Sequence, residues 1–134
     1  MKENTFKTTI EPRFCETDAI GHIGNTTMPC WLEYARKPIF EALHPSLNVM
    51  DWPLIVAKVN IDYLAQIYVD SSVTVETGVS HIGNKSFTVL QKVYQNGKQV
   101  SRGETVIVYF DFKTKITSSI PDESRKFLSE HIFQ

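Results

Sequence analysis

A short polar segment, residues 16–25, contains the side chains best suited to chemistry in this sequence. It carries a carboxylate at Asp18, an imidazole at His22 and a Gly24-Asn25 pair, and it directly precedes a predicted helix. The first N–H groups of an α-helix have no acceptor inside the helix and carry partial positive charge, so they can hold an oxyanion. A carboxylate a few residues upstream could attack a carbonyl group held there, or activate water against it. This arrangement suits acyl transfer.

The residues after this segment have the spacing of a helix that would position it. Apolar side chains recur at i, i+3, i+4 and i+7 over residues 28–43. Asn25, Thr26 or Thr27 could supply the N-cap oxygen, and Pro29 suits the first turn. Pro38 lies inside the pattern and lacks an N–H, so we expect a kink or a split near residues 36–37.

The rest of the chain reads mainly as strands. Alternating or continuous apolar runs predict five strands, and Asn96-Gly97 is a strong hairpin signal. The predicted strands are at residues 6–14, 54–63, 73–80, 86–95 and 99–113. A terminal helix is predicted at 122–132. The pattern is α+β, with a mostly antiparallel sheet and one long central helix. The length of 134 residues fits a single domain, residues 1–134.

Composition excludes several classes of protein. The 14 basic and 15 acidic side chains give a net charge of −1, which argues against a nucleic-acid partner. No apolar run approaches the ~20 residues that cross a bilayer, and the first residues do not resemble a secretory signal. We therefore expect a cytoplasmic protein without a membrane partner, with its two cysteines reduced. The four histidines are scattered, so we predict no metal site.

Other interpretations of the polar residues stay open. Asp18 could simply cap the loop, since aspartate is common before helices. Glu33, on the predicted helix, is the main rival for the reacting carboxylate, although it could be an ordinary polar-face residue. We expect His22 to fix the loop rather than to act as a base.

Longer stretches carry a family resemblance. Residues 17–25 (TDAIGHIGN) and 31–36 (WLEYAR) resemble the motif of the hot-dog-fold acyl-CoA thioesterases, and the branch most similar is the 4-hydroxybenzoyl-CoA thioesterase-like group. The similarity continues through 61–65, the Gly83…Ser86 hairpin and Ile120-Pro121. The resemblance implies a hot-dog fold, in which a curved antiparallel sheet of five or six strands wraps around one long central helix.

The resemblance also implies roles for individual residues. Asp18 falls on the catalytic aspartate of the family, acting as nucleophile or general base. Gly24 and Asn25 fall where backbone N–H groups polarise the thioester carbonyl. His22 and Met28 are expected to position the loop or the substrate, and Met28 stands where a tyrosine is common in the family.

The function expected from this resemblance is hydrolysis of an acyl-CoA to a carboxylic acid and free CoA. No cofactor is expected, since coenzyme A is part of the substrate. The expected assembly is a homodimer with active sites at the subunit interface, and a dimer of dimers is the larger alternative. Two other functions stay open: a thioesterase acting on acyl-carrier-protein thioesters, and a non-catalytic acyl-CoA-binding dimer.

Overall fold

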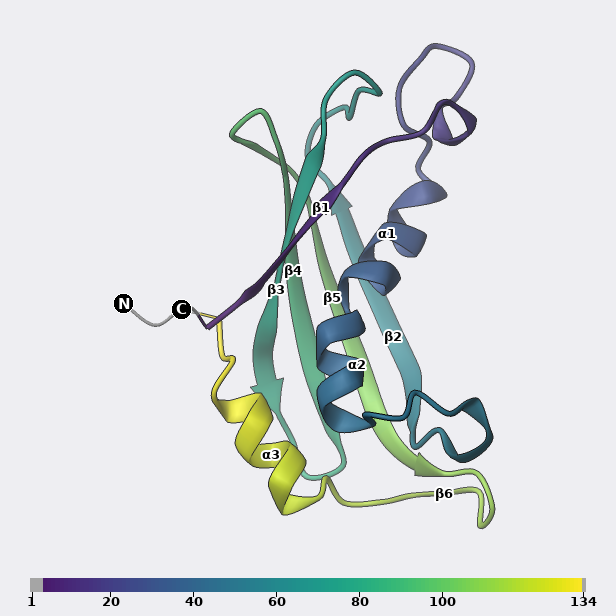
Figure 1. Ribbon diagram of the computed structural model, residues 1–134, viewed down its shortest axis with the longest axis vertical. Coiled ribbons are helices and arrows are strands. Elements are labelled where there is room, and N and C mark those ends of the chain that lie inside the picture. The colour runs from purple at the N-terminus through teal and green to yellow at the C-terminus, as the bar shows by residue number, and fades with distance from the viewer. Residues whose placement is uncertain (1–3, 134) are drawn as a thin grey trace.

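The computed structural model describes residues 4–133, in which an antiparallel sheet carries two helices across one face (Figure 1). Every predicted strand is present, and two match their predicted bounds. The strands are β1 (Phe6–Ile10), β2 (Leu54–Tyr63), β3 (Val73–Ile82), β4 (Ser86–Gln95), β5 (Lys98–Asp111) and the short β6 (Ile116–Thr117). The helices are α1 (Thr27–Ala35), α2 (Lys37–Leu43) and α3 (Asp122–Ser129), with 3-10 turns at Phe14–Glu16 and Val49–Asp51.

The sheet has six strands in the order β1-β3-β4-β5-β2, with β6 paired to the end of β5. All neighbouring strands are antiparallel. The pairing register shifts between Val56 and Lys58 in β2 and between Val79 and His81 in β3. Such bulges bend a strand and increase its twist, which lets the sheet curl around the helices.

The central helix is split, as Pro38 predicts. α1 ends at Ala35, Arg36 separates the two helices, and α2 begins at Lys37 with Pro38 in its first turn. The loop that precedes α1 lies at one end of this two-helix rod, and the segments that follow α2 and β5 lie at the other end (Figure 1). The two ends of the rod therefore face different parts of the molecule.

The core consists of two apolar clusters, one beside each helix. The first packs α1 against the sheet and contains Met28, Trp31, Leu32, Ala35, Val73, Val75, Val93 and Val100, with Ile23 and Ile67. The second packs α2 and α3 against the sheet and contains Ile39, Leu54, Val79, Phe87, Val89, Ile107, Tyr109, Ile120 and Leu128.

A buried polar belt, made of Arg36, Thr77, Gln91 and Thr105, lies at the break in the helix. Gln91 Nε2 donates to the Leu32 carbonyl (2.9 Å), and Thr77 Oγ1 donates to the Ala35 carbonyl (3.3 Å). Ala35 would accept from Ile39 in an unbroken helix, but the Ile39 N–H donates to Arg36 instead. Side chains of the sheet therefore satisfy carbonyls at the end of α1.

Several details differ from the prediction. The first strand stops at Ile10 rather than continuing to residue 14, because Pro12 cannot donate to a strand ladder and the chain then turns into a 3-10 helix. Both cysteines are unpaired and exposed. Among residues 4–133, no helix is long and apolar enough to cross a membrane.

Candidate functional site

The segment before α1 forms a tight loop around the Asp18 carboxylate. Thr17 and Ile23 pair as an antiparallel bridge, and the Asp18 N–H donates to the His22 carbonyl (2.7 Å). Asp18 Oδ1 accepts hydrogen bonds from the N–H groups of Ile20 (3.0 Å) and His22 (3.2 Å). Within residues 4–133, Oδ2 has no donor, and the side chain is exposed. Hydrogen bonds to Oδ1 therefore orient the carboxylate, and Oδ2 accepts none from the described residues.

Glu16 fastens this loop to α1. Its Oε2 accepts from the Trp31 indole (2.9 Å), its Oε1 accepts from the Arg13 N–H (2.8 Å), and its carbonyl accepts from the Gly24 N–H (2.9 Å). Burial acts to raise the pKa of Glu16, but the hydrogen bonds from Arg13 and Trp31 outweigh it, so the pKa lies below its usual value. Glu16 is therefore held as an anion that anchors both ends of the loop.

The N-terminus of α1 offers two free backbone donors. The Gly24 N–H is already used by Glu16, so Gly24 does not fit the carbonyl-polarising role predicted for it. The N–H groups of Asn25 and Thr26 have no acceptor among residues 4–133. The N-cap residue is Thr26, with no capping bond from its side chain. The backbone N–H of Asn25 is therefore free to donate, and its role in polarising a carbonyl stays a prediction.

Tyr63 fixes the peptide that carries one of these donors. From the last residue of β2, its hydroxyl donates to the Asn25 carbonyl at 2.5 Å. That carbonyl belongs to the same peptide group as the Thr26 N–H. A hydrogen bond to a peptide oxygen polarises the group and strengthens its N–H as a donor. Tyr63 thus orients and activates the start of the helix.

Of the two other predicted site residues, His22 is half-buried and Met28 is buried. The His22 ring packs edge-on against Tyr68 (5.1 Å between ring centroids), and its buried Nδ1 has no hydrogen-bond partner among residues 4–133. His22 holds the Asp18 loop through its backbone N–H and carbonyl rather than through its ring. Met28 is 1% exposed in the core, so its side chain is not open to a substrate in the single chain, and its positioning role stays a prediction. The helical period explains this, because Met28 lies on the same face as Trp31 and Leu32.

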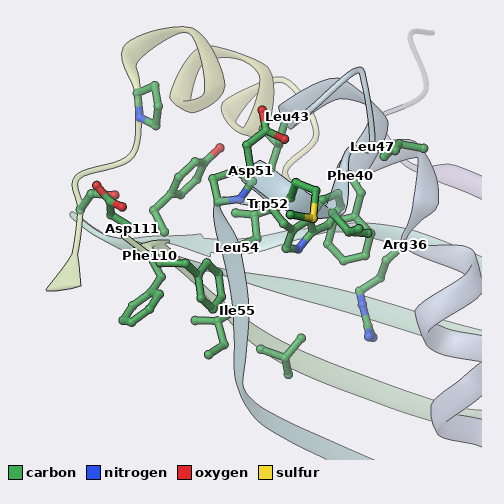
Figure 2. Close-up of a pocket in the computed structure, with 18 of the residues that line it drawn as sticks. Arg36, Phe40, Leu43, Leu47, Asp51, Trp52, Leu54, Ile55, Phe110 and Asp111 are labelled. Carbon is green, nitrogen blue, oxygen red and sulfur yellow. The ribbon is translucent and has the colours of Figure 1, made fainter. Parts of the chain in front are cut away.

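A large groove of the described chain lies beside α1 and α2. It has a volume of about 1350 Å³ and lies between the two helices, the segment 47–53, the start of β2 and the end of β5. Phe40 and Trp52 meet edge to face there (5.6 Å between centroids), and Figure 2 shows them beside Leu43 and Leu54. On α1, Cys30, Glu33 and Tyr34 line the groove.

The groove and the Asp18 loop are separate in the single chain. None of Asp18, His22, Gly24, Asn25 and Met28 lines the groove, whereas the rival carboxylate of Glu33 does. Arg36 also lines it, and burial lowers the pKa of Arg36 against the opposing effect of Glu33. The structure thus brings four predicted residues together at the helix start and places the acyl-sized space along the helix.

Sequence reasoning missed Glu16, Tyr63 and Arg36. Glu16 bonds to a side chain 15 positions away and Tyr63 to a carbonyl 38 positions away, so no local pattern marks them. Arg36 does carry a signal, because a cation beside a predicted helix break, close to apolar residues of the helical pattern, is a candidate for burial.

Comparison with known proteins places this geometry in a family. Residues 12–128 match the model of the thioesterase-like superfamily. The chain belongs to the thioesterase-like superfamily. A curated relative, the uncharacterized protein YsmA of Bacillus subtilis (strain 168), is 27% identical over 126 residues, which is 92% of this chain and 85% of that protein.

Solved structures of proteins named as thioesterases have the same fold. The structure of a predicted thioesterase from Bacillus stearothermophilus is 42% identical, with a TM-score of 0.94, and the match covers 97% of this chain and 98% of that one. A thioesterase from Thermus thermophilus complexed with coenzyme A and Zn superimposes with a TM-score of 0.82 at 24% identity, covering 91% and 95%. This member of the thioesterase-like superfamily therefore has the predicted hot-dog fold.

A mutant 4-hydroxybenzoyl-CoA thioesterase complexed with 4-hydroxybenzoyl-CoA also shares the fold, with a TM-score of 0.81 at 15% identity, covering 93% of this chain and 99% of that one.

Within residues 4–133, no group of three histidine, cysteine, aspartate or glutamate side chains could hold a metal ion.

Proposed function

We propose that this member of the thioesterase-like superfamily is a cytoplasmic acyl-CoA thioesterase of the 4-hydroxybenzoyl-CoA thioesterase-like branch, with Asp18 as its reacting carboxylate. One observation carries the proposal. An exposed carboxylate oxygen without a donor stands in a loop that leads directly to a helix N-terminus with two free N–H groups. A carbonyl polarised by those N–H groups would be attacked from the side of the loop.

Two routes to the same products use these groups. As a nucleophile, Asp18 Oδ2 forms a C–O bond to the thioester carbonyl, the C–S bond breaks, the thiolate of CoA leaves, and water then hydrolyses the mixed anhydride. As a general base, Asp18 takes a proton from a water molecule whose oxygen attacks the carbonyl, and the thiolate again leaves. In both routes the N–H groups of Asn25 and Thr26 stabilise the oxyanion. Neither route needs a metal ion or an organic cofactor.

A homodimer is part of the proposal, because the edge strand β2 is apolar and uncovered. Among residues 4–133, β2 pairs only with β5, and four of its apolar side chains are 41–50% exposed: Ile55, Val56, Val59 and Tyr63. An exposed apolar edge favours pairing with a second copy of the chain. The paired sheets would then cover the groove beside β2 and enclose an acyl group in it.

A thiol-release assay tests the proposal. Wild-type protein is given short-chain, long-chain and aromatic acyl-CoAs, and the Asp18→Asn and Glu33→Gln variants follow on the best substrate. Asparagine keeps the Oδ1 acceptor of the loop but can neither attack nor take a proton, so we expect kcat to fall by about a hundredfold or more with KM little changed. We expect Glu33→Gln to keep most of the activity.

Other results would reassign the function. Full activity in Asp18→Asn and loss of activity in Glu33→Gln would move the reaction to the helix glutamate. Hydrolysis of acyl-carrier-protein thioesters alone would favour a carrier-protein thioesterase. Saturable acyl-CoA binding without thiol release would favour a non-catalytic binding protein.

A further inference from the structure

Arg36 is a buried cation without an anionic partner. It is 4% exposed, and its Nη1 donates to two neutral groups, Gln91 Oε1 (3.4 Å) and Thr105 Oγ1 (3.2 Å). Its Nε is buried and has no acceptor, and Nη2 has none among residues 4–133. None of the ion pairs between described residues includes Arg36. The Glu33 carboxylate acts on Arg36 only from beyond ion-pair distance, and it raises the pKa of Arg36 less than burial lowers it. A buried charge without a directly bonded anion is costly, so that missing anion is the feature to explain.

The polar belt does not itself account for the charge of Arg36. Gln91 and Thr77 already satisfy the carbonyls of Leu32 and Ala35 at the helix break. Arg36 contributes only one of its nitrogens to the belt, and neutral side chains could fill that place at lower cost. Nε is enclosed by protein atoms, so Nη2 is the guanidinium nitrogen left to donate to a carboxylate.

The acyl-sized groove leads to this guanidinium. Arg36 lines the groove, and Figure 2 shows its side chain extending from the helix away from Phe40. Two other charged residues of the groove already have partners, since Lys37 pairs with Glu41 (3.6 Å) and Asp51 with His44 (3.0 Å). Arg36 thus has no ion-pair partner among residues 4–133, and it lies in the wall of a largely apolar groove that Glu33 also lines.

Groove residues on the helices lie in line with the proposed reaction site. Thr26, Cys30, Glu33 and Lys37 recur at helical spacing on one side of the rod, and the last three line the groove. Ten residues separate Thr26 from Arg36, which is a rise of about 15 Å along a helix. A medium-length acyl chain, held at its carbonyl by the Thr26 N–H, would reach the region of Arg36.

We propose that Arg36 binds a carboxylate at the far end of the acyl group, so that the preferred substrates are mono-thioesters of dicarboxylic acids. This inference rests on the proposed thioesterase function and names its substrate class. The ligand carboxylate supplies the missing negative charge and accepts from Nη2. A chain ending in a methyl group leaves Arg36 unpaired, and this difference makes the site selective.

Matched substrate pairs test the inference on the wild-type protein. Octanoyl-CoA is compared with suberoyl-CoA, and decanoyl-CoA with sebacoyl-CoA, since each pair has the same chain length and differs only in the terminal carboxylate. We expect kcat/KM to be higher by about tenfold or more for the carboxylated member of at least one pair, as for a charge-assisted hydrogen bond. Equal or lower values in both pairs would overturn the inference while leaving the thioesterase function intact.

Variants locate the effect. Arg36→Gln is expected to remove the preference for the carboxylated chain, whereas Arg102→Gln removes an arginine paired with Glu104 on β5 and is expected to keep the preference. An undiminished preference in Arg36→Gln would overturn the assignment to Arg36. If Arg36→Gln does not fold, the kcat/KM values of the wild-type protein for the matched substrate pairs still test the inference.

Calorimetry separates this inference from the proposed function. Free octanoate and 1-octanol are titrated into wild-type protein and into Arg36→Gln, so no turnover is needed. Octanoate binding that exceeds octanol binding in wild-type protein, but not in Arg36→Gln, would support the carboxylate site even if no acyl-CoA is hydrolysed, in which case the proposed function alone fails. Octanol binding as tight as octanoate binding in wild-type protein would contradict the carboxylate site.

Discussion

The two ends of the helical rod are built in different ways. At the α1 end, hydrogen bonds hold an exposed polar loop: Glu16 anchors it, Asp18 orients it, and Tyr63 fixes the first peptide of the helix. At the α2 end, apolar side chains such as Phe40 and Trp52 line an open groove. The buried polar belt lies between them.

The difference separates two tasks. Hydrogen bonds fix direction as well as distance, so they suit an end that has to hold a carboxylate beside backbone donors. Apolar contacts are non-directional, so the groove end can accept different chains. We therefore propose that the reaction takes place at the α1 end, and that the groove and Arg36 select the acyl group.

The polar belt should be the most sensitive element. Gln91→Leu removes the donor to the Leu32 carbonyl and one acceptor of the Arg36 guanidinium. Because both groups are buried, we expect the free energy of unfolding to fall by about 3 kcal/mol, measured by urea titration. Gln99→Leu, whose amide makes only a 3.5 Å contact, should change stability by less than about 0.5 kcal/mol. Wild-type stability in Gln91→Leu would show that the belt is dispensable.

Loss of Glu16, which anchors the loop, should have the next largest effect. Glu16→Ala leaves the Trp31 indole and the Arg13 N–H without their acceptor. We expect a loss of about 2 kcal/mol in unfolding free energy, together with a lower kcat as the Asp18 loop loosens. Glu11→Ala, at an exposed position, is the matched control. An unchanged kcat in Glu16→Ala would show that the hydrogen bonds of Glu16 are not needed for the reaction.

Tyr63 should affect catalysis more than stability. Tyr63→Phe removes the hydrogen bond to the Asn25 carbonyl but keeps the ring. We expect kcat to fall by about tenfold with KM little changed, since the Thr26 N–H becomes a weaker donor to the oxyanion. Tyr94→Phe on β4 serves as control. A rise in KM without a change in kcat would assign Tyr63 to substrate binding instead.

The smallest effect should be on the pH dependence of stability. The folded pKa of Glu16 lies below its usual value of 4.5, so the contribution of Glu16 is fully present above that value and is lost as pH falls through the folded pKa. Urea titrations should therefore show wild-type stability declining more than that of Glu16→Gln only below about pH 4.5. If the stability of both proteins declined equally with pH, the charge of Glu16 would not contribute to stability.

Much of the fold could be predicted because it depends on local periodicity. The strands at residues 54–63 and 86–95 have their predicted bounds, and Pro38 marks the split in the helix. Periodicity also explains the burial of Met28, which lies on the apolar face of the predicted helix.

The site could be predicted only in part. Asp18 and Asn25 stand out because they precede a helix, which is a local signal. The use of the Gly24 N–H by Glu16 depends on how the loop folds back, and the contact of Gln91 with Leu32 spans 59 positions. Contacts of this kind depend on the register of the sheet against the helix, which no single segment encodes.

A crystal structure of the Asp18→Asn variant with a bound acyl-CoA tests the central claim most directly. The account predicts the thioester oxygen within hydrogen-bond distance of the Asn25 or Thr26 N–H, the substituted side chain facing the carbonyl carbon, and the acyl chain running toward Arg36. A thioester lying beside Glu33, with no ligand atom at the start of α1, would contradict it.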